Sequence, residues 1–249
     1  MIVKIQVNGF EWSADLRKPL SIGITLRNGK DNPNCFYAEM PSIKPFRSGN
    51  FIGDIKKGAP VNFKNVSFNP HGNGTHTECS GHILDNGQVV GDLLEHFFFP
   101  CRLITLTPTD IGDDKVLGVG TNLDEYNFKG VEALVIRSLP NSDRKLIKDY
   151  SGCNPPYFDP LFMSKVNELD ISHFLTDLPS VDKEKDGGKL SSHCSFWNSS
   201  FKDRTRCTIT ELIYVPDGIV DGLYLLELQI MNLDLDASPS RPLLYKLYE

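Results

Sequence analysis

Long apolar runs and a secretory leader are both missing from this sequence. No stretch reaches the roughly 18 consecutive apolar residues that a membrane-spanning helix needs, so the sequence predicts no membrane span. The first residues, MIVKIQVNGFEW, do not join a charged segment to an apolar one, so we expect no signal peptide. They alternate instead in the manner of a first β-strand.

A basic stripe is missing as well. The 249 residues include 26 Lys and Arg against 32 Asp and Glu, which makes the net charge −6. A nucleic-acid partner would usually require a cluster of basic side chains, so we expect no such partner. With 40% hydrophobic and 23% charged residues, the composition is typical of a globular protein and excludes disorder for most of the chain.

Cysteine pairs with metal-binding or redox spacing are also absent. The six cysteines are scattered along the chain, and no two of them form a CxxC pair. In a chain of this length we expect free thiols rather than a disulfide framework, and therefore a cytoplasmic protein.

Short β-branched and apolar runs outnumber helical patterns. We expect strands within residues 1–7, 61–68, 101–108, 131–138, 171–181, 207–215, 222–233 and 243–247. Residues 160–168 have the apolar spacing of a helix, whereas residues 27–60 predict loops or short hairpins and residues 183–189 predict a surface loop. No repeat or low-complexity linker divides the chain. The sequence therefore predicts one domain over residues 1–249, α/β or α+β, with a mixed sheet.

Histidine is concentrated in one segment, PHGNGTHTECSGH, at residues 70–82. Three of the six histidines, His71, His76 and His82, lie there together with the carboxylate of Glu78. Imidazole and carboxylate ligands suit Zn²⁺, Mn²⁺ or a similar divalent ion. His76 and Glu78 are two residues apart, so on a strand they face the same side, and the glycines after His71 let the chain bend back toward them. The alternative is a solvated loop, but few structural roles need several imidazoles together.

This segment resembles the motif H-x-G-T-H-x-D-x-P-x-H of the cyclase family of metal-dependent hydrolases, which includes bacterial kynurenine formamidase and isatin hydrolase. Other parts of the chain resemble that family in the same order, namely DLRKPL at 15–20, LTDLPSVD at 175–182, TITEL at 208–212 and ASPSRPL at 237–243. The resemblance implies an α/β fold of the swivelling β/β/α type, with the metal site in a pocket near a mixed sheet.

The resemblance also implies a set of metal ligands. His71, His76 and Glu78 would bind a first ion. Glu78 would bridge to a second ion, which His193 and Glu211 would complete. One or two ions of Zn²⁺ or Mn²⁺ per chain are therefore expected.

The remaining site residues are predicted less directly. His82 takes the place of the family's catalytic histidine, which moves protons rather than binding metal. Phe196 and Trp197 follow His193 closely and are candidates to line a pocket for an aromatic substrate. For the phenylalanines at 97–99, core packing is the favoured interpretation. His96 and His173 are expected to be structural, and for Asp177 and Asp182 both a hydrogen-bonding and a catalytic role stay open.

Three positions depart from the family motif. Glu78 stands where the family has aspartate, one extra residue separates His71 from His76, and Ser80 replaces the proline. The types of ligand survive all three changes, so we still expect a metal site.

The activity implied by the resemblance is metal-dependent hydrolysis of an amide by an activated water. The reaction would be like that of an arylformamidase, acting on N-formylkynurenine or a related aryl or cyclic amide, with a role in tryptophan catabolism. Two alternatives stay open: a polyketide-type cyclase, and a metal-binding protein that binds a small molecule without turnover. The expected partners are a small-molecule substrate and further copies of the chain, in a homodimer or homotetramer.

Overall fold

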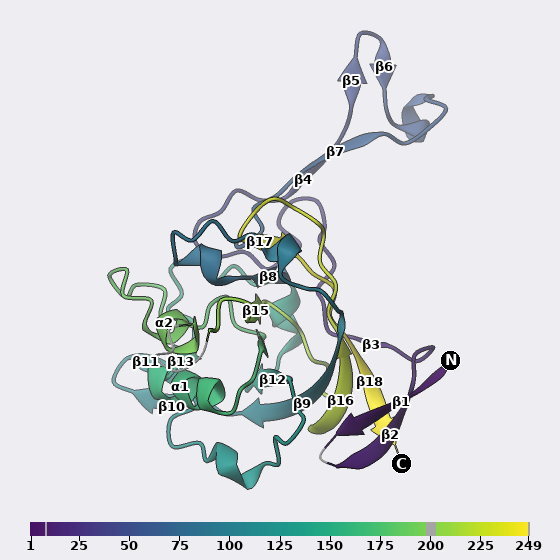
Figure 1. Cartoon of the computed structure of the whole chain (residues 1–249). Helices are drawn as coiled ribbons and strands as arrows, with labels where there is room; N and C mark the ends of the chain where they lie inside the picture. Colours follow the sequence, from purple (N-terminus) through teal and green to yellow (C-terminus); the bar gives the residue numbers. More distant parts are fainter. Residues whose placement is uncertain (8, 198–202, 249) are drawn as a thin grey trace.

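The computed structural model describes residues 1–7, 9–197 and 203–248, and a mixed β-sheet runs through its centre (Figure 1). The strands of this sheet are β1 (Ile2–Val7), β2 (Phe10–Asp15), β3 (Leu20–Ser21), β8 (His76–Glu78), β9 (Phe98–Leu106), β12 (Ala133–Ser138), β14 (His173–Thr176), β15 (Thr208–Glu211), β16 (Gly222–Glu227), β17 (Ala237–Pro239) and β18 (Leu243–Tyr248). Their order in the described chain is β1-β2-β18-β16-β9-β12-β14-β15-β8-β17, with β3 paired to β18. Strands β9, β12, β14 and β15 are mutually parallel, and the outer pairs are antiparallel. The predicted α/β class and mixed sheet are confirmed.

The other elements are short. The remaining strands are β4 (Ser42–Pro45) with β7 (Lys64–Ser67), β5 (Arg47–Ser48) with β6 (Phe51–Ile52), and β10 (Thr109–Ile111) with β11 (Asp114–Leu117) and β13 (Tyr157–Phe158). The two α-helices of the described chain are α1 (Pro160–Glu168) and α2 (Ser191–Trp197). Neither has the length and apolar character of a membrane span. All six cysteines are free thiols, as predicted.

The parallel strands are buried on both faces. On β12, Leu134 and Ile136 belong to the apolar cluster that contains Phe162 of α1. Ala133 and Val135 of the same strand point into a second cluster on the other face of the sheet. Because both faces need apolar side chains, the sequence of this strand is a continuous apolar run rather than an alternating one.

The sequence predicts one helix correctly and misses the other. Helix α1 has the expected bounds. It is capped at its N-terminus by Asp159, whose side chain accepts a hydrogen bond from the Leu161 N–H at 3.0 Å. Helix α2 has the sequence SSHCSFW, whose serines and aromatic residues are not strong helix formers. Its first turn is held from outside the helix, because the Asp182 carboxylate accepts hydrogen bonds from the backbone N–H groups of Ser192 and His193.

Residues 41–67 form an arm that projects away from the rest of the protein (Figure 1). Strands β4 and β7 pair along its length, and β5 and β6 form a hairpin near its tip. The hairpins expected within residues 27–60 are therefore present, whereas the strand expected at 61–68 is shorter and comprises only β7. Inside the arm, the rings of Phe46 and Phe63 are 5.0 Å apart between centroids.

His173 has the structural environment expected from the sequence. It lies on β14, where its Nδ1 is 2.9 Å from Thr208 Oγ1 and its ring centroid is 4.0 Å from that of Phe99. Burial lowers the pKa of the His173 imidazole to about 3, so the ring is neutral in the folded protein at ordinary pH.

We predict that His173 makes the fold sensitive to acid. In the unfolded chain a histidine has a pKa of about 6.5, so below that pH the unfolded state takes up a proton that the folded state does not. Above about pH 7, His173 should therefore have no effect on how the free energy of unfolding depends on pH. Between about pH 6.5 and 3 it should lower that free energy by up to about 1.4 kcal/mol per pH unit. Urea denaturation with a chelator present should show a shallower acid slope for His173→Gln than for the wild type. His96→Gln is the matched control, and an equal change in both variants would contradict the assignment.

Candidate metal centre

Strand β8 brings the histidine-rich segment into the sheet between β15 and β17. His76 and Glu78 lie on this strand, and their side chains face the same side, with 4.0 Å between His76 Nε2 and Glu78 Oε2. The antiparallel pairing of β8 with β15 puts Glu211 directly opposite His76. Their side chains are adjacent as a result, with 3.5 Å between His76 Nε2 and Glu211 Oε2. Two segments more than 130 residues apart therefore share one cluster of ligand atoms.

Four imidazoles surround the carboxylate of Glu78, which is 1% exposed. His71 Nδ1 lies 3.1 Å from Glu78 Oε2, and His193 Nε2 lies 3.0 Å from Oε1. His82 Nε2 and His76 Nε2 are more distant, at 3.9 Å and 4.0 Å from Oε2. All the metal ligands and the proton shuttle predicted from the sequence thus lie in one cluster.

The three predicted histidine ligands are each oriented through the ring nitrogen that faces away from the cluster. His76 Nδ1 lies 2.9 Å from the backbone oxygen of Gly74. His193 Nδ1 lies 2.5 Å from Asp182 Oδ2, and His71 Nε2 lies 2.9 Å from Asp236 Oδ2. A metal-binding histidine characteristically donates its other ring N–H to a carboxylate or a carbonyl, which fixes the tautomer and the ring orientation.

Two carboxylates complete the site, and the sequence assigned neither of them there. The open question about Asp182 is answered by its contact with His193, which is a hydrogen-bonding role. Asp236 belongs to no predicted motif, although it directly precedes the segment at 237–243 that resembles the family. Its Oδ2 atom contacts both His71 and His82, the latter at 3.1 Å from Nδ1. The pairing of β17 with β8 brings it there, because the Asp236 backbone oxygen accepts a hydrogen bond from the Cys79 N–H.

Two buried polar atoms in this cluster have no hydrogen-bond partner within the described chain. They are His76 Nε2 and Glu78 Oε2; the 3.1 Å contact between His71 Nδ1 and Glu78 Oε2 is an ion-pair distance without the geometry of a hydrogen bond. A buried polar atom without a partner is costly, and such an atom in a folded protein commonly indicates a missing water or ion. The atoms of His71, His76 and Glu78 that could bind a metal lie within 4.8 Å of one another, as do those of Glu78, His82 and His193. The residues present therefore fit a divalent ion.

The charged groups of the cluster strongly shift one another's pKa values. Burial lowers the pKa of His193, but hydrogen bonds with Asp182 and Glu78 outweigh this effect and raise the pKa to about 10. Burial likewise opposes ionisation of Glu78, and the contacts with His193 and His71 nevertheless hold the pKa of its carboxyl well below the usual range. Glu78 is therefore ionised in the absence of a metal, and a metal ion that binds His193 would have to displace a proton from its ring.

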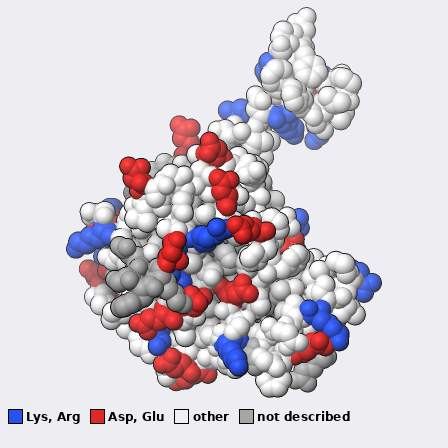
Figure 2. Space-filling model, in the orientation of Figure 1, with Lys and Arg blue, Asp and Glu red and all other residues white. Residues whose placement is uncertain are grey.

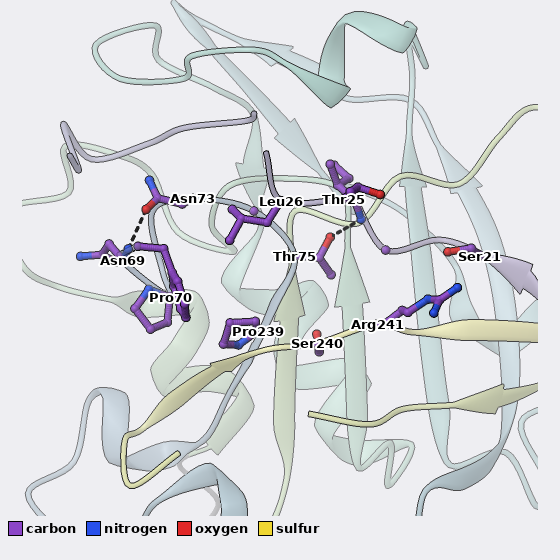
Figure 3. A pocket seen from close by; sticks show the side chains of 14 residues that line it. Ser21, Thr25, Leu26, Asn69, Pro70, Asn73, Thr75, Pro239, Ser240 and Arg241 are labelled. Atoms are coloured by element: carbon purple, nitrogen blue, oxygen red, sulfur yellow. Dashed lines mark hydrogen bonds between the residues drawn. The ribbon is translucent and has the colours of Figure 1, made fainter. Parts of the chain in front are cut away.

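The backbone between His71 and His76 bends sharply enough to accommodate the extra residue. Gly74 has a φ of +141°, a conformation that other residues rarely adopt, and the turn before it lets His71 reach Glu78. Thr75 anchors the segment, since its Oγ1 accepts a hydrogen bond from the Ile24 N–H at 2.8 Å (Figure 3). The same hydroxyl donates a hydrogen bond to the Leu212 oxygen. Figure 3 also shows Asn73, whose side chain accepts a hydrogen bond from the Asn69 N–H. These residues line a hollow of about 500 Å³ beside the ligand-bearing segment.

A cavity of about 210 Å³ opens beside the cluster, with His71, Glu78, His82, His193 and Glu211 among its lining residues. Its aromatic lining residue is Phe36, which the sequence did not single out.

The two aromatic residues predicted to contact substrate do not line this cavity. Phe196 is fully buried in the main apolar core. Trp197 is 3% exposed, stacks on the His193 ring at 5.6 Å between centroids and donates a hydrogen bond from Nε1 to the Cys207 oxygen. Both residues follow His193 on helix α2, which turns them toward the core. Of the phenylalanines at 97–99, Phe99 is buried as expected, but Phe97 and Phe98 are exposed.

The sequence matches the family model named Cyclase ("Putative cyclase") over residues 14–183, and the chain belongs to this family. Its fold is similar to that of isatin hydrolase A from Labrenzia aggregata, with 14% identity and a TM-score of 0.66 over 92% of this chain and 93% of that chain. A predicted metal-dependent hydrolase from Bacillus stearothermophilus is also similar, with 14% identity and a TM-score of 0.62 over 92% of this chain and 98% of that chain. At these identities the likeness shows the fold. A search of curated proteins found no match.

We predict that Asp236 strengthens metal binding. Asp236→Asn keeps the size of the side chain but weakens the contact that orients His71, so the affinity for Zn²⁺ and Mn²⁺ should fall by about 10–100-fold. Isothermal titration of each ion into metal-free protein would measure this. The matched control is Asp234→Asn, which makes the same change at an exposed aspartate two residues earlier in the chain. Equal affinities for Asp236→Asn and the wild type would show that Asp236 does not support the site.

Proposed function

We propose that this protein is a metal-dependent hydrolase of an amide, with a reaction like that of an arylformamidase. N-formylkynurenine or a related aryl or cyclic amide is the proposed substrate. One observation carries the proposal: four imidazoles surround the buried carboxylate of Glu78 beside Glu211, and two polar atoms of this cluster, His76 Nε2 and Glu78 Oε2, have no hydrogen-bond partner in the described chain. Family membership and the names of the similar structures, metal-dependent hydrolase and isatin hydrolase, support it.

His71, His76 and Glu78 are proposed to hold one ion. Glu78, His193 and Glu211 are proposed to hold a second, so that each chain binds one or two ions of Zn²⁺ or Mn²⁺. Nitrogen and carboxylate donors without thiolate are compatible with either metal. A divalent ion at such a site polarises a carbonyl and lowers the pKa of a water toward neutrality. Glu211 is itself held in place, because its Oε1 accepts a hydrogen bond from the Val181 N–H.

His82 is proposed to move the proton. Its side chain is 30% exposed, so it can contact both the cluster and a substrate in the adjoining cavity. Asp236 lies against its Nδ1 and leaves Nε2 directed toward Glu78. An imidazole in this position can accept a proton from the attacking water and give it to the leaving amine.

Turnover measurements test the proposal. Purified protein should contain one or two divalent ions per chain by elemental analysis, and it should hydrolyse N-formylkynurenine or isatin in a chelator-sensitive way. Bound metal without hydrolysis of either amide would favour the alternative of a binding protein, and ring closure of a polyketide substrate would favour a cyclase. Failure to bind either ion after reconstitution would contradict the proposal.

Two histidine variants separate the ligand role from the proton-transfer role. His82→Ala should keep nearly all its metal and lose turnover by roughly 10²–10⁴-fold, the usual contribution of a general acid–base group. His76→Ala should lose metal as well as activity, since His76 lies in the centre of the cluster. Glu78→Gln, which removes the charge shared by two ions, should also lower the metal content. If His82→Ala removes metal as completely as His76→Ala, then His82 is a ligand.

We also propose that the chain forms a homodimer or homotetramer through the arm. Residues 41–67 contain five Lys and Arg and one acidic residue, so the arm is positive in a chain of net charge −6. Figure 2 shows Lys and Arg on the arm, and Asp and Glu at many places on the body. The arm also exposes apolar side chains such as Val61, Phe63 and Val66, each more than half exposed. A basic and partly apolar arm is complementary to the acidic body of a second copy.

The arm proposal predicts salt-sensitive and arm-dependent assembly. Sedimentation equilibrium should give a dimer or tetramer for the wild type. Lys56→Glu combined with Lys57→Glu, near the tip of the arm, should weaken self-association by at least about 10-fold. The matched control reverses Lys18 and Lys30, which lie outside the arm. A wild-type protein that is monomeric at all concentrations would exclude the proposal.

The remaining expectations rest on the family for the fold type and on the sequence composition for the domain count and the location. We propose the swivelling β/β/α type for the fold, a single domain over residues 1–249 and a cytoplasmic location. A contribution to tryptophan catabolism follows only if N-formylkynurenine is the substrate.

A further inference from the structure

A third cavity, larger than the two described above, lies at the carboxyl ends of two parallel strands. It encloses about 740 Å³ and is lined by Ser138 at the end of β12, by Leu178 just after β14, and by parts of residues 139–156. It shares no lining residue with the cavity beside the metal centre. In sheets with parallel strands, ligands characteristically bind outside the carboxyl ends of the strands, and the volume is in the range of small-molecule sites.

The charged residues that line this cavity are all basic. They are Lys115, Arg144, Lys145 and Lys148, and no Asp or Glu is among the lining residues. A cavity of this charge attracts an anion.

Two of the four cations already have partners. Lys145 Nζ lies 2.8 Å from Asp177 Oδ2 and donates a hydrogen bond to the Ser138 oxygen. Lys115 Nζ is 2.6 Å from Asp110 Oδ1. Arg144 and Lys148 form no ion pair within the described residues, and Lys148 Nζ lies 4.7 Å from the centre of the Tyr150 ring. Arg144 and Lys148 are therefore the cations available to a ligand.

The other walls of the cavity are apolar. Leu139 is 38% exposed and Ile147 is 55% exposed, and both line it together with three prolines. Apolar side chains that are exposed inside a concave site gain stability when a ligand covers them. The site thus combines a charged end with an apolar surface.

We propose that this cavity binds a small organic anion with an apolar body. The carboxylate or another anionic group would contact Arg144 and Lys148, and the hydrocarbon body would lie against Leu139 and Ile147. The site is separate from the metal centre, so the proposal does not depend on the hydrolase function.

Isothermal titration with three related probes tests the class of ligand. Naphthalene-1-acetate has both the anionic group and the apolar body, naphthalene-1-acetamide lacks the charge, and acetate lacks the body. We expect naphthalene-1-acetate to bind at one site per chain at least about 10-fold more tightly than either of the others, equivalent to about 1.4 kcal/mol. Equal affinity for the amide would overturn the role of charge, and equal affinity for acetate would overturn the role of the apolar wall.

Variants locate the binding to this cavity. Arg144→Glu combined with Lys148→Glu should weaken binding of naphthalene-1-acetate by about 10-fold or more. Ile147→Ser should weaken it several-fold by removing part of the wall. The matched control, Lys18→Glu with Lys30→Glu, reverses two exposed cations that lie outside both this cavity and the arm, and it should leave the affinity unchanged. An unchanged affinity in the Arg144 and Lys148 variant would overturn the proposal, because any binding would then occur elsewhere, for example at the metal centre.

Discussion

The buried carboxylate of Glu78 is the constraint on which the candidate site depends. An ionised carboxylate that is 1% exposed cannot be left without partners, because the loss of hydration would cost several kcal/mol. Imidazoles from both halves of the chain supply those partners, and a metal ion would supply the remaining one. The two strands that flank β8 contribute as well, because β15 places Glu211 beside His76 and the start of β17 places Asp236 beside His71.

The sheet explains how such a polar cluster coexists with a stable core. The parallel strands β9, β12 and β14 are buried on both faces by apolar clusters. The polar residues gather instead on the short strand β8 and at the end of β15, toward one edge of the sheet. Trp197 joins the two regions, because it stacks on His193 and packs in the main apolar core. Packing against the core thereby restrains the ring of His193, a proposed metal ligand, and this favours a preorganised site.

The charge of the molecule is also unevenly distributed. The arm is basic, the body that Figure 2 shows has many acidic groups, and one cavity is lined only by basic charged residues. The net charge of the whole sequence conceals these differences, because the basic and acidic regions largely cancel in the sum.

The sequence alone determined the parts of this protein that depend on local order. The β-branched runs, the spacing in residues 160–168 and the alternation of His76 and Glu78 depend on neighbours in the chain, and the structure confirms them. Membership of the cyclase family could also be predicted from the sequence, since the family's motifs are short and occur in the same order along the chain. The placement of Asp236 beside His82, the capping of α2 by Asp182, and the burial of Phe196 were not readable. Each depends on which distant strands pair and which face a helix turns to the core, and only tertiary packing decides these.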